Sequence, residues 1–375
     1  MIFGTPVKTN QGLIRVEHVR EGHQIWHREG WKTVAQKVEL GPCLPLKLQT
    51  DLGYSILVSP ERDLDVLLST GAIGTRKAYN MQGDYLLLDY GIRPFPEIVL
   101  GLPPSDIQVP EYMSVPLAYL IGTFAGSDLH QFKWRELQEK VRKQIAMCFE
   151  ACFGDIQNQK NMRGTFDFSQ NALLWYWFQK IDIGCEHSSQ LILRSPKIHA
   201  ISFLRGAWDM KGQVDAQISL DVGSFRTTLL LEIQALMLDV GIECRIEGKP
   251  RKLVVSAADR KKFAATIGFT DPAVQKRAEA SSVTERKWPL WSFYATLCQR
   301  YRNLISCSSL EKKILSGASV RVPASALSAL CHLLPPEAPE AVYLNALLHG
   351  ALPVQVVDVK QVNTALLAFK LEYTS

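Results

Sequence analysis

The sequence predicts an α+β fold in which a helix-rich middle region with an internal repeat is inserted into an all-β domain. Three observations predict it. Short β-rich runs fill the first 66 residues, the pattern becomes helical after about residue 110, and residues 353–375 return to strand-like text. We therefore expect residues 1–110 and 284–375 to form one β-rich domain with its linkers, and residues 111–283 to form the inserted domain.

The strand-like text at the start of the chain is divided by turn residues. The runs LIRVEHV, KVEL, LPLKLQT and YSILVS favour strands, and Asn10-Gln11-Gly12, Gly41-Pro42 and Asp51-Leu52-Gly53 separate them as turns. Five prolines between Pro94 and Pro110 then mark a boundary. Beyond residue 283 the runs SFYATLCQRYRNLI and ASALSALCHLL predict helices, and PVQVVDVKQV and ALLAFKLEYTS predict a closing pair of strands.

The middle region contains a weak internal repeat. Two stretches share the order of a glycine-containing apolar helix, strand-like text and a further amphipathic helix. The glycine-containing helices are expected at 116–126 and 201–212. The second copy continues with the strands AQISLDV, CRIEG and KLVVSA and the helix TLLLEIQALMLDVGI. We expect two αββαββ-like halves, at about 111–195 and 196–283, whose glycine-containing helices pack side by side at a pseudo-twofold axis.

Composition excludes a disordered or membrane-spanning chain. With 375 residues, 47% of them hydrophobic and 21% charged, the chain is expected to fold into two or three compact units. The net charge of +5 permits a polyanionic partner but does not demand one. Eight scattered cysteines without a Cys-x-x-Cys pair indicate reduced thiols rather than a zinc site. No signal-peptide pattern and no apolar run near the roughly 20 residues of a membrane span occur, so we expect a reducing intracellular location such as the cytoplasm, without secretion or a membrane partner.

The middle region resembles the LAGLIDADG homing endonucleases. The run FLRGAWDMKGQV, from Phe203 to Val214, is similar to the family's FLRGLFDADGSV, and LIGTFAGSD, from Leu120 to Asp128, is a looser copy. Arg194-Ser195-Pro196 resembles the basic-Ile-Pro triplet that precedes such a helix. Downstream positions follow the family in the same order: Leu236, Gly241, Ile242, Phe263, Ile267, Gly268, Phe269 and Lys276. Agreement at this many ordered positions is hard to obtain by chance.

The flanking regions resemble the splicing domain of inteins, which has the Hint fold. GTPVKT at residues 4–9, with Gly12, Val19 and Gly22, is similar to the opening block of that domain. LVSPER at residues 57–62 is similar to the block that contains Thr-x-x-His, and residues 354–372 are similar to the closing strands. The resemblance therefore covers nearly the whole chain and implies an intein interrupted by a homing endonuclease.

The residues that splicing requires are replaced. Splicing needs a nucleophile at the first residue, an assisting histidine and a terminal asparagine. Here Met1 or Ile2 stands at the nucleophile position, Arg62 stands at the histidine position, and the sequence finishes with Tyr373-Thr374-Ser375 in place of His-Asn. We expect no splicing, and we expect the flanks to act as a β-fold that holds the middle region.

The resemblance also defines candidate catalytic positions. In the family each glycine-containing helix ends with an acid, and the two acids hold Mg²⁺. The aligned positions are Ser127 and Lys211, where a hydroxyl is a poor ligand and an ammonium repels a cation. Asp128 would need a helix slip of one residue, and Asp209 lies about 200° around the helix from Lys211. We expect no metal and no cofactor, with Mg²⁺ required only if these rearranged acids still cleave DNA.

Double-stranded DNA is the partner that the resemblance implies. The family binds it on a saddle of two antiparallel sheets, with basic residues on phosphates and alternate side chains on base edges. The basic runs at 249–252 and 260–262 fit solvated turns and helix faces equally well. The candidate nucleic-acid-binding residues are Lys133, Arg135, Lys160, Arg163, Lys197, Arg226, Arg245, Lys249, Arg251 and Lys252.

The sequence therefore leaves three competing hypotheses about function. The leading hypothesis is a domesticated protein, inactive in splicing and cleavage, that binds DNA or serves as a structural component of a larger assembly with protein partners. The first alternative is an active site-specific endonuclease with rearranged acids, and the second is a protein–protein interaction module. A basic saddle beside a degenerate metal site favours the first hypothesis, and loss of basic side chains from the saddle favours the interaction module.

Overall fold

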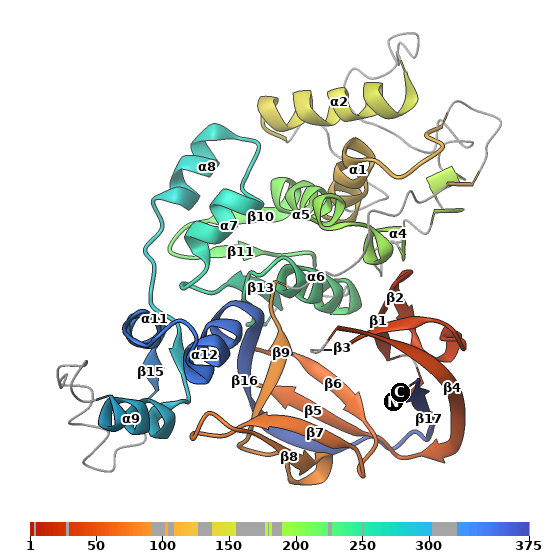
Figure 1. Ribbon diagram of the computed structural model, residues 1–375. Helices are drawn as coiled ribbons and strands as arrows, with labels where there is room; N and C mark the ends of the chain where they lie inside the picture. The colour runs from red at the N-terminus through yellow and green to blue at the C-terminus, as the bar shows by residue number, and fades with distance from the viewer. Residues whose placement is uncertain are drawn as a thin grey trace. The chain divides into compact units, whose positions relative to one another are not determined.

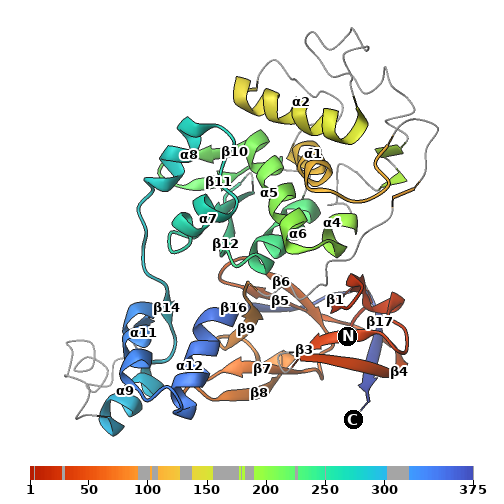
Figure 2. The same cartoon turned by 45° about the horizontal axis from the view of Figure 1, so that its top comes forward.

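The structure is a computed structural model of a mixed α+β chain (Figures 1 and 2). It describes residues 1–3, 5–27, 30–91, 102–103, 109–126, 137–154, 177–178, 180–181, 190–223, 227–249, 251–301 and 321–374. The chain divides into two compact units. The β unit consists of residues 1–5, 38–92 and 284–370, and the helix-pair unit consists of residues 6–37, 93–283 and 371–375. Residues 6–37 therefore group with the middle of the sequence.

The β unit is built on a six-stranded sheet whose central strands come from both ends of the sequence. Its order is β6 (Ser55–Val58), β5 (Leu46–Thr50), β16 (Ala351–Gln361), β9 (Tyr85–Asp89), β7 (Asp63–Leu67) and β8 (Ile73–Lys77). The first half of β16 pairs with β9 and its second half pairs with β5, with an irregularity between Val356 and Asp358. A strand from the last 25 residues of the sequence thus pairs with two strands from the first 90.

A helical layer with its own core completes the β unit. It contains β14 (Lys287–Trp288), α9 (Trp291–Arg300), β15 (Val322–Pro323), α11 (Ala324–Leu333) and α12 (Pro339–Gly350). Trp288, Leu327 and Leu344 are fully buried in this core. The sequence predicted α9 and α11 but not α12, which begins with a proline at its first turn, where a missing N–H costs no hydrogen bond.

A second sheet has five strands. Its order is β17 (Leu366–Tyr373), β4 (Gly30–Cys43), β3 (Gln24–His27), β1 (Pro6–Thr9) and β2 (Gly12–Arg15). The predicted strand LIRVEHV ends at Arg15 and continues as a 3₁₀ turn, Val16–His18. A second 3₁₀ turn, Ala78–Asn80, precedes β9.

The helix-pair unit contains the predicted glycine-containing helices. Its elements are α1 (Val115–Gly126), α2 (Glu139–Phe153), α4 (Gln190–Arg194), α5 (Lys197–Lys211), β10 (Gly212–Val214), β11 (Ile218–Leu220), α6 (Thr227–Asp239), β12 (Cys244–Glu247), β13 (Lys252–Val255), α7 (Arg260–Thr266) and α8 (Pro272–Glu279). The order from α5 to β13 confirms the αββαββ pattern expected of the second half. The strand-like text of the first half lies outside the described residues.

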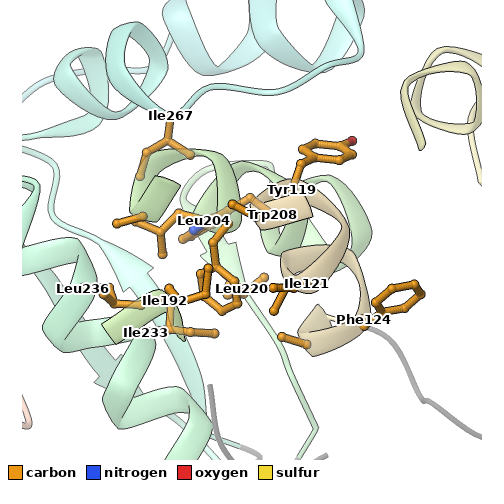
Figure 3. Packing of buried hydrophobic residues seen from close by; sticks show 14 of the residues in the cluster. Tyr119, Ile121, Phe124, Ile192, Leu204, Trp208, Leu220, Ile233, Leu236 and Ile267 are labelled. Carbon is orange, nitrogen blue, oxygen red and sulfur yellow. The ribbon is translucent and has the colours of Figure 1, made fainter. Parts of the chain in front are cut away.

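One hydrophobic core joins the helices and the sheet of the helix-pair unit. Figure 3 shows Ile121 of α1, Leu204 of α5, Leu220 of β11 and Ile233 of α6 gathered in one cluster, with Phe124 on the opposite side of α1. Every residue of α1 from Leu117 to Gly126 is buried. This burial explains why the helix has apolar residues on all sides and is not amphipathic. Among the described tryptophans, Trp177, Trp208 and Trp288 are fully buried core residues. None of the described helices combines the length and apolarity needed to cross a membrane.

Candidate functional site at the helix pair

The backbones of α1 and α5 touch where each helix carries a glycine. A Cβ atom built on Gly122 would lie 1.9 Å from the carbonyl oxygen of Phe203. A Cβ atom built on Gly206 would lie 2.2 Å from the carbonyl oxygen of Tyr119. Both distances are far below van der Waals contact, so only glycine permits this approach. The prediction that the two helices pack side by side is confirmed.

The two glycine contacts are reciprocal. Phe203 lies three residues before Gly206, and Tyr119 lies three residues before Gly122. Each glycine therefore faces the carbonyl group three residues before the other glycine. A twofold axis between two helices produces this reciprocal relation.

The symmetry is broken one helical turn further on. Gly126 and Met210 each lie four residues after their glycine, so they occupy equivalent positions. A Cβ atom on Gly126 would lie 2.9 Å from the Cβ atom of Met210 and 2.9 Å from the carbonyl oxygen of Ala207. A small residue on α1 thus makes room for a large one on α5. The next position on each helix is the one aligned with the family's acids.

Asp209 is held inside the unit by three hydrogen bonds. Its carboxylate accepts from the Tyr119 hydroxyl at 2.7 Å, from the Thr270 backbone N–H at 2.8 Å and from the Thr270 hydroxyl at 2.5 Å. Burial raises the pKa of the Asp209 carboxyl, although the hydrogen bonds from Thr270 and Tyr119 oppose that shift. Burial and the charge of Asp209 also raise the pKa of Tyr119. The carboxylate therefore ties α5 to α1 and to the segment before α8.

Lys211 occupies the other candidate position on α5. It is the last residue of the helix, it is exposed, and it forms no ion pair within the described part of the chain. Ser127 and Asp128 lie outside the described residues. In the described ranges there is no group of three or more His, Cys, Asp or Glu side chains that could hold a metal ion. The end of α5 thus presents a cation where the family has a metal-binding acid.

The four-stranded sheet, in the order β10-β11-β13-β12, has one face in the core and one face away from it. The register places Gln213, Ser219, Val254, Arg245, Glu247 and Lys252 on the outer face. Two residues at its centre are closed to solvent, since Ser219 is 7% and Val254 is 1% exposed. Arg245 forms an ion pair with Glu247 on the same face. This face offers few groups that could contact DNA bases.

Apart from Arg245, the candidate nucleic-acid-binding residues fall into three groups. Lys249, Arg251 and Lys252 lie at the β12–β13 turn, as expected of a solvated turn, and form no ion pair with any residue that the structure describes. Lys197 lies on the first turn of α5, after Pro196 at the N-cap, and its contact with DNA stays a prediction. The remaining candidates, Lys133, Arg135, Lys160, Arg163 and Arg226, lie outside the described residues.

Arg62 stands at the position aligned with the splicing histidine. Its carbonyl oxygen accepts a hydrogen bond from the N–H of Ala78, and its own N–H donates to Ser59. The backbone of this segment is therefore fixed in a turn, while the side chain is exposed. A guanidinium remains protonated at any ordinary pH and cannot act as the general base that a histidine provides.

Sequence analysis did not identify Tyr119 and Thr270 as partners of Asp209. A signal for Tyr119 is present, because a buried hydroxyl in an otherwise apolar helix requires an acceptor. Thr270 carries no comparable signal, because it lies 61 residues from Asp209 in the sequence.

The fold and site define a mixed α+β protein with a glycine-packed helix pair. No known protein family and no curated protein matches the chain.

Proposed function

We propose that this chain is a splicing- and cleavage-incompetent relative of intein-borne LAGLIDADG endonucleases, retained as a DNA-binding or structural component of a larger assembly. The observation that carries the proposal is the reciprocal contact of Gly122 and Gly206, each against the carbonyl three residues before the other glycine. Such a contact is what two copies of one motif make at a twofold axis. The order of the sequence motifs, which resembles that family, also supports the proposal.

The hydrogen bonds that Asp209 accepts support the loss of DNA cleavage. A carboxylate that holds Mg²⁺ must present free oxygen lone pairs to the metal. Both oxygens of Asp209 accept hydrogen bonds from Tyr119 or Thr270, and the pKa of the group is raised, which disfavours the ionised form that binds metal. Lys211 adds a positive charge at the end of the same helix. Both features weigh against the alternative of an active endonuclease.

Double-stranded DNA is the partner favoured by the unpaired cations. Lys211 and the turn residues Lys249 and Arg251 are exposed and form no ion pair among the described residues. Such side chains bind phosphates without reading sequence, with the affinity falling as salt rises. A protein partner is the second candidate. It is favoured by the pairing of Arg245 with Glu247, which neutralises one cation of the outer sheet face.

A binding and cleavage experiment tests the proposal. The full chain is incubated with a random double-stranded DNA library, with Mg²⁺ or Mn²⁺, and cut ends are sequenced while binding is followed by a gel-shift assay. We expect no specific double-strand break. Specific cleavage that Asp128→Asn abolishes would show that the acid has moved, and the proposal would be wrong.

Binding without cleavage has a separate control. Lys249→Ala with Arg251→Ala removes two unpaired cations, whereas Lys143→Ala removes a cation that is paired with Glu139 on α2. If DNA is the partner, the double variant lowers the affinity and flattens its salt dependence by about two counterions, and Lys143→Ala leaves both unchanged. Absence of any salt-dependent binding by the unmodified chain would leave the protein partner as the proposed role.

A further inference from the structure

The β1–β2 hairpin is held against the helix-pair unit by an ion pair with little access to water. Lys8 Nζ on β1 lies 2.9 Å from Asp239 Oδ1, and the two side chains are 18% and 11% exposed. Asp239 is the last residue of α6, where the helix dipole disfavours a negative charge. The ammonium of Lys8 offsets that unfavourable placement. Loss of Lys8 would remove this ion pair from a carboxylate that is largely shielded from solvent.

The turn of the same hairpin fits closely against α4. Gly12 has a φ of +100°, and a Cβ atom built on it would lie 2.6 Å from Cα of Arg194. Arg194 Nε donates a hydrogen bond of 3.1 Å to the carbonyl oxygen of Gln11. Leu13 packs against the same hydrophobic core that contains α1, α5 and α6. The hairpin is therefore joined to α4, to α6 and to the core.

We propose that the β1–β2 hairpin, residues 6–15, is a strap on the helix-pair core, so that β1, β2 and α6 open and close as one cooperative unit. The sequence resemblance assigns these residues to the opening block of a splicing domain, but their contacts are those of an integral part of the middle unit. The strap acts whether or not the protein binds DNA, because it depends only on contacts within the unit. A ligand or partner that shifts α6 would thus also shift β1.

Hydrogen exchange on the full chain tests the strap. Backbone amides of β1, β2 and the last turns of α6 are followed by mass spectrometry over a series of sub-denaturing urea concentrations. We expect the three elements to share one urea dependence. In Lys8→Met we expect exchange in all three to be faster by about 10-fold or more, because the ion pair between β1 and α6 is lost.

A matched variant controls for the loss of a lysine charge. Lys77→Met breaks the pair between Lys77 and Asp63, whose side chains are 38% and 57% exposed, and should leave exchange in residues 6–15 and 227–239 unchanged. Faster exchange in the hairpin alone, with α6 unaffected, would overturn the proposal, and so would no change in either element. If Lys8→Met does not fold, the urea series on the unmodified chain decides, since separate transitions for β1 and α6 also overturn it.

Discussion

Replacement of Gly122 by alanine should open the helix pair. The added methyl group would lie 1.9 Å from the Phe203 carbonyl oxygen, whereas carbon and oxygen atoms rarely approach below about 3 Å. The two helices must therefore separate by more than about 1 Å. Because α1 is buried from Leu117 onward and shares one core with α5 and α6, that movement loosens the packing of all three helices.

The expected cost follows from two opposing effects. Overpacking of a well-packed core costs typically about 1–3 kcal/mol, and a clash between a methyl group and a backbone carbonyl lies at the upper end because neither group can rotate away. Alanine regains about 1 kcal/mol of helix propensity over glycine. We expect a net loss of about 2 kcal/mol or more for Gly122→Ala and a similar loss for Gly206→Ala. Gly126→Ala, whose nearest atoms lie at 2.9 Å, should lose less.

Urea unfolding monitored by circular dichroism measures these losses. Ala146→Gly, at an exposed position in α2, gives the propensity scale and should cost about 1 kcal/mol. A graded order, with Gly122→Ala and Gly206→Ala below Gly126→Ala in stability, supports the described contact. If Gly122→Ala is neutral or more stable than the unmodified protein, the helices do not touch at this position and the pseudo-twofold argument fails.

Three further predictions concern Asp209 and Lys211. Asp209→Ala should lower the free energy of unfolding in urea by about 2–3 kcal/mol, because the Tyr119 hydroxyl and both Thr270 donors lose their acceptor. Asp209→Asn should lower it by less than about 1 kcal/mol, because its amide can donate to the two hydroxyls. Equal losses for the two variants would refute this role of Asp209. Since burial raises the folded-state pKa of Asp209, its stabilising contribution is complete below the unfolded value of about 4 and decreases as the pH rises through the folded pKa. Asp209→Asn should therefore gain stability relative to the unmodified chain as the pH rises above about 4 in thermal melts; a difference that does not vary with pH contradicts the shift. If DNA binds near the end of α5, Lys211→Ala should lower the affinity and reduce the salt slope by about one counterion in a gel-shift series, and an unchanged slope would place DNA elsewhere.

The sequence predicts best where a periodic pattern or a dense motif is present. The two glycine-containing helices and the order from α5 to β13 follow from apolar periodicity and motif spacing. Helix α5 begins at Lys197, four residues before the expected start, because Pro196 supplies the N-cap position that the apolar pattern does not reveal. The strands β8 and β9 lie beyond the strand-like first 66 residues and were not predicted. Strand β8 is short, largely exposed and carries little apolar alternation.

The pairing of strands that are distant in the sequence could not be predicted from local sequence patterns. Alternating residues in 353–362 indicate a strand, but they do not specify that β9 and β5 would be its neighbours. The hydrogen bonds of Asp209 likewise join residues that are 90 and 61 positions apart. At the candidate site, the replacement of the aligned acid by Lys211 was visible in the sequence. The structural use of Asp209 required the fold.

The position of β16 at the centre of the six-stranded sheet has a consequence for how the protein is made. Strands β5 and β9 leave the ribosome early, but their shared neighbour lies at residues 351–361. At typical synthesis rates of about 5–20 residues per second, those strands wait for roughly 15–50 seconds with unpaired edges, and an unpaired edge invites pairing with other chains. Loop closure over so many residues also slows folding. The β unit is therefore expected to be the late-folding and aggregation-prone part of the nascent chain.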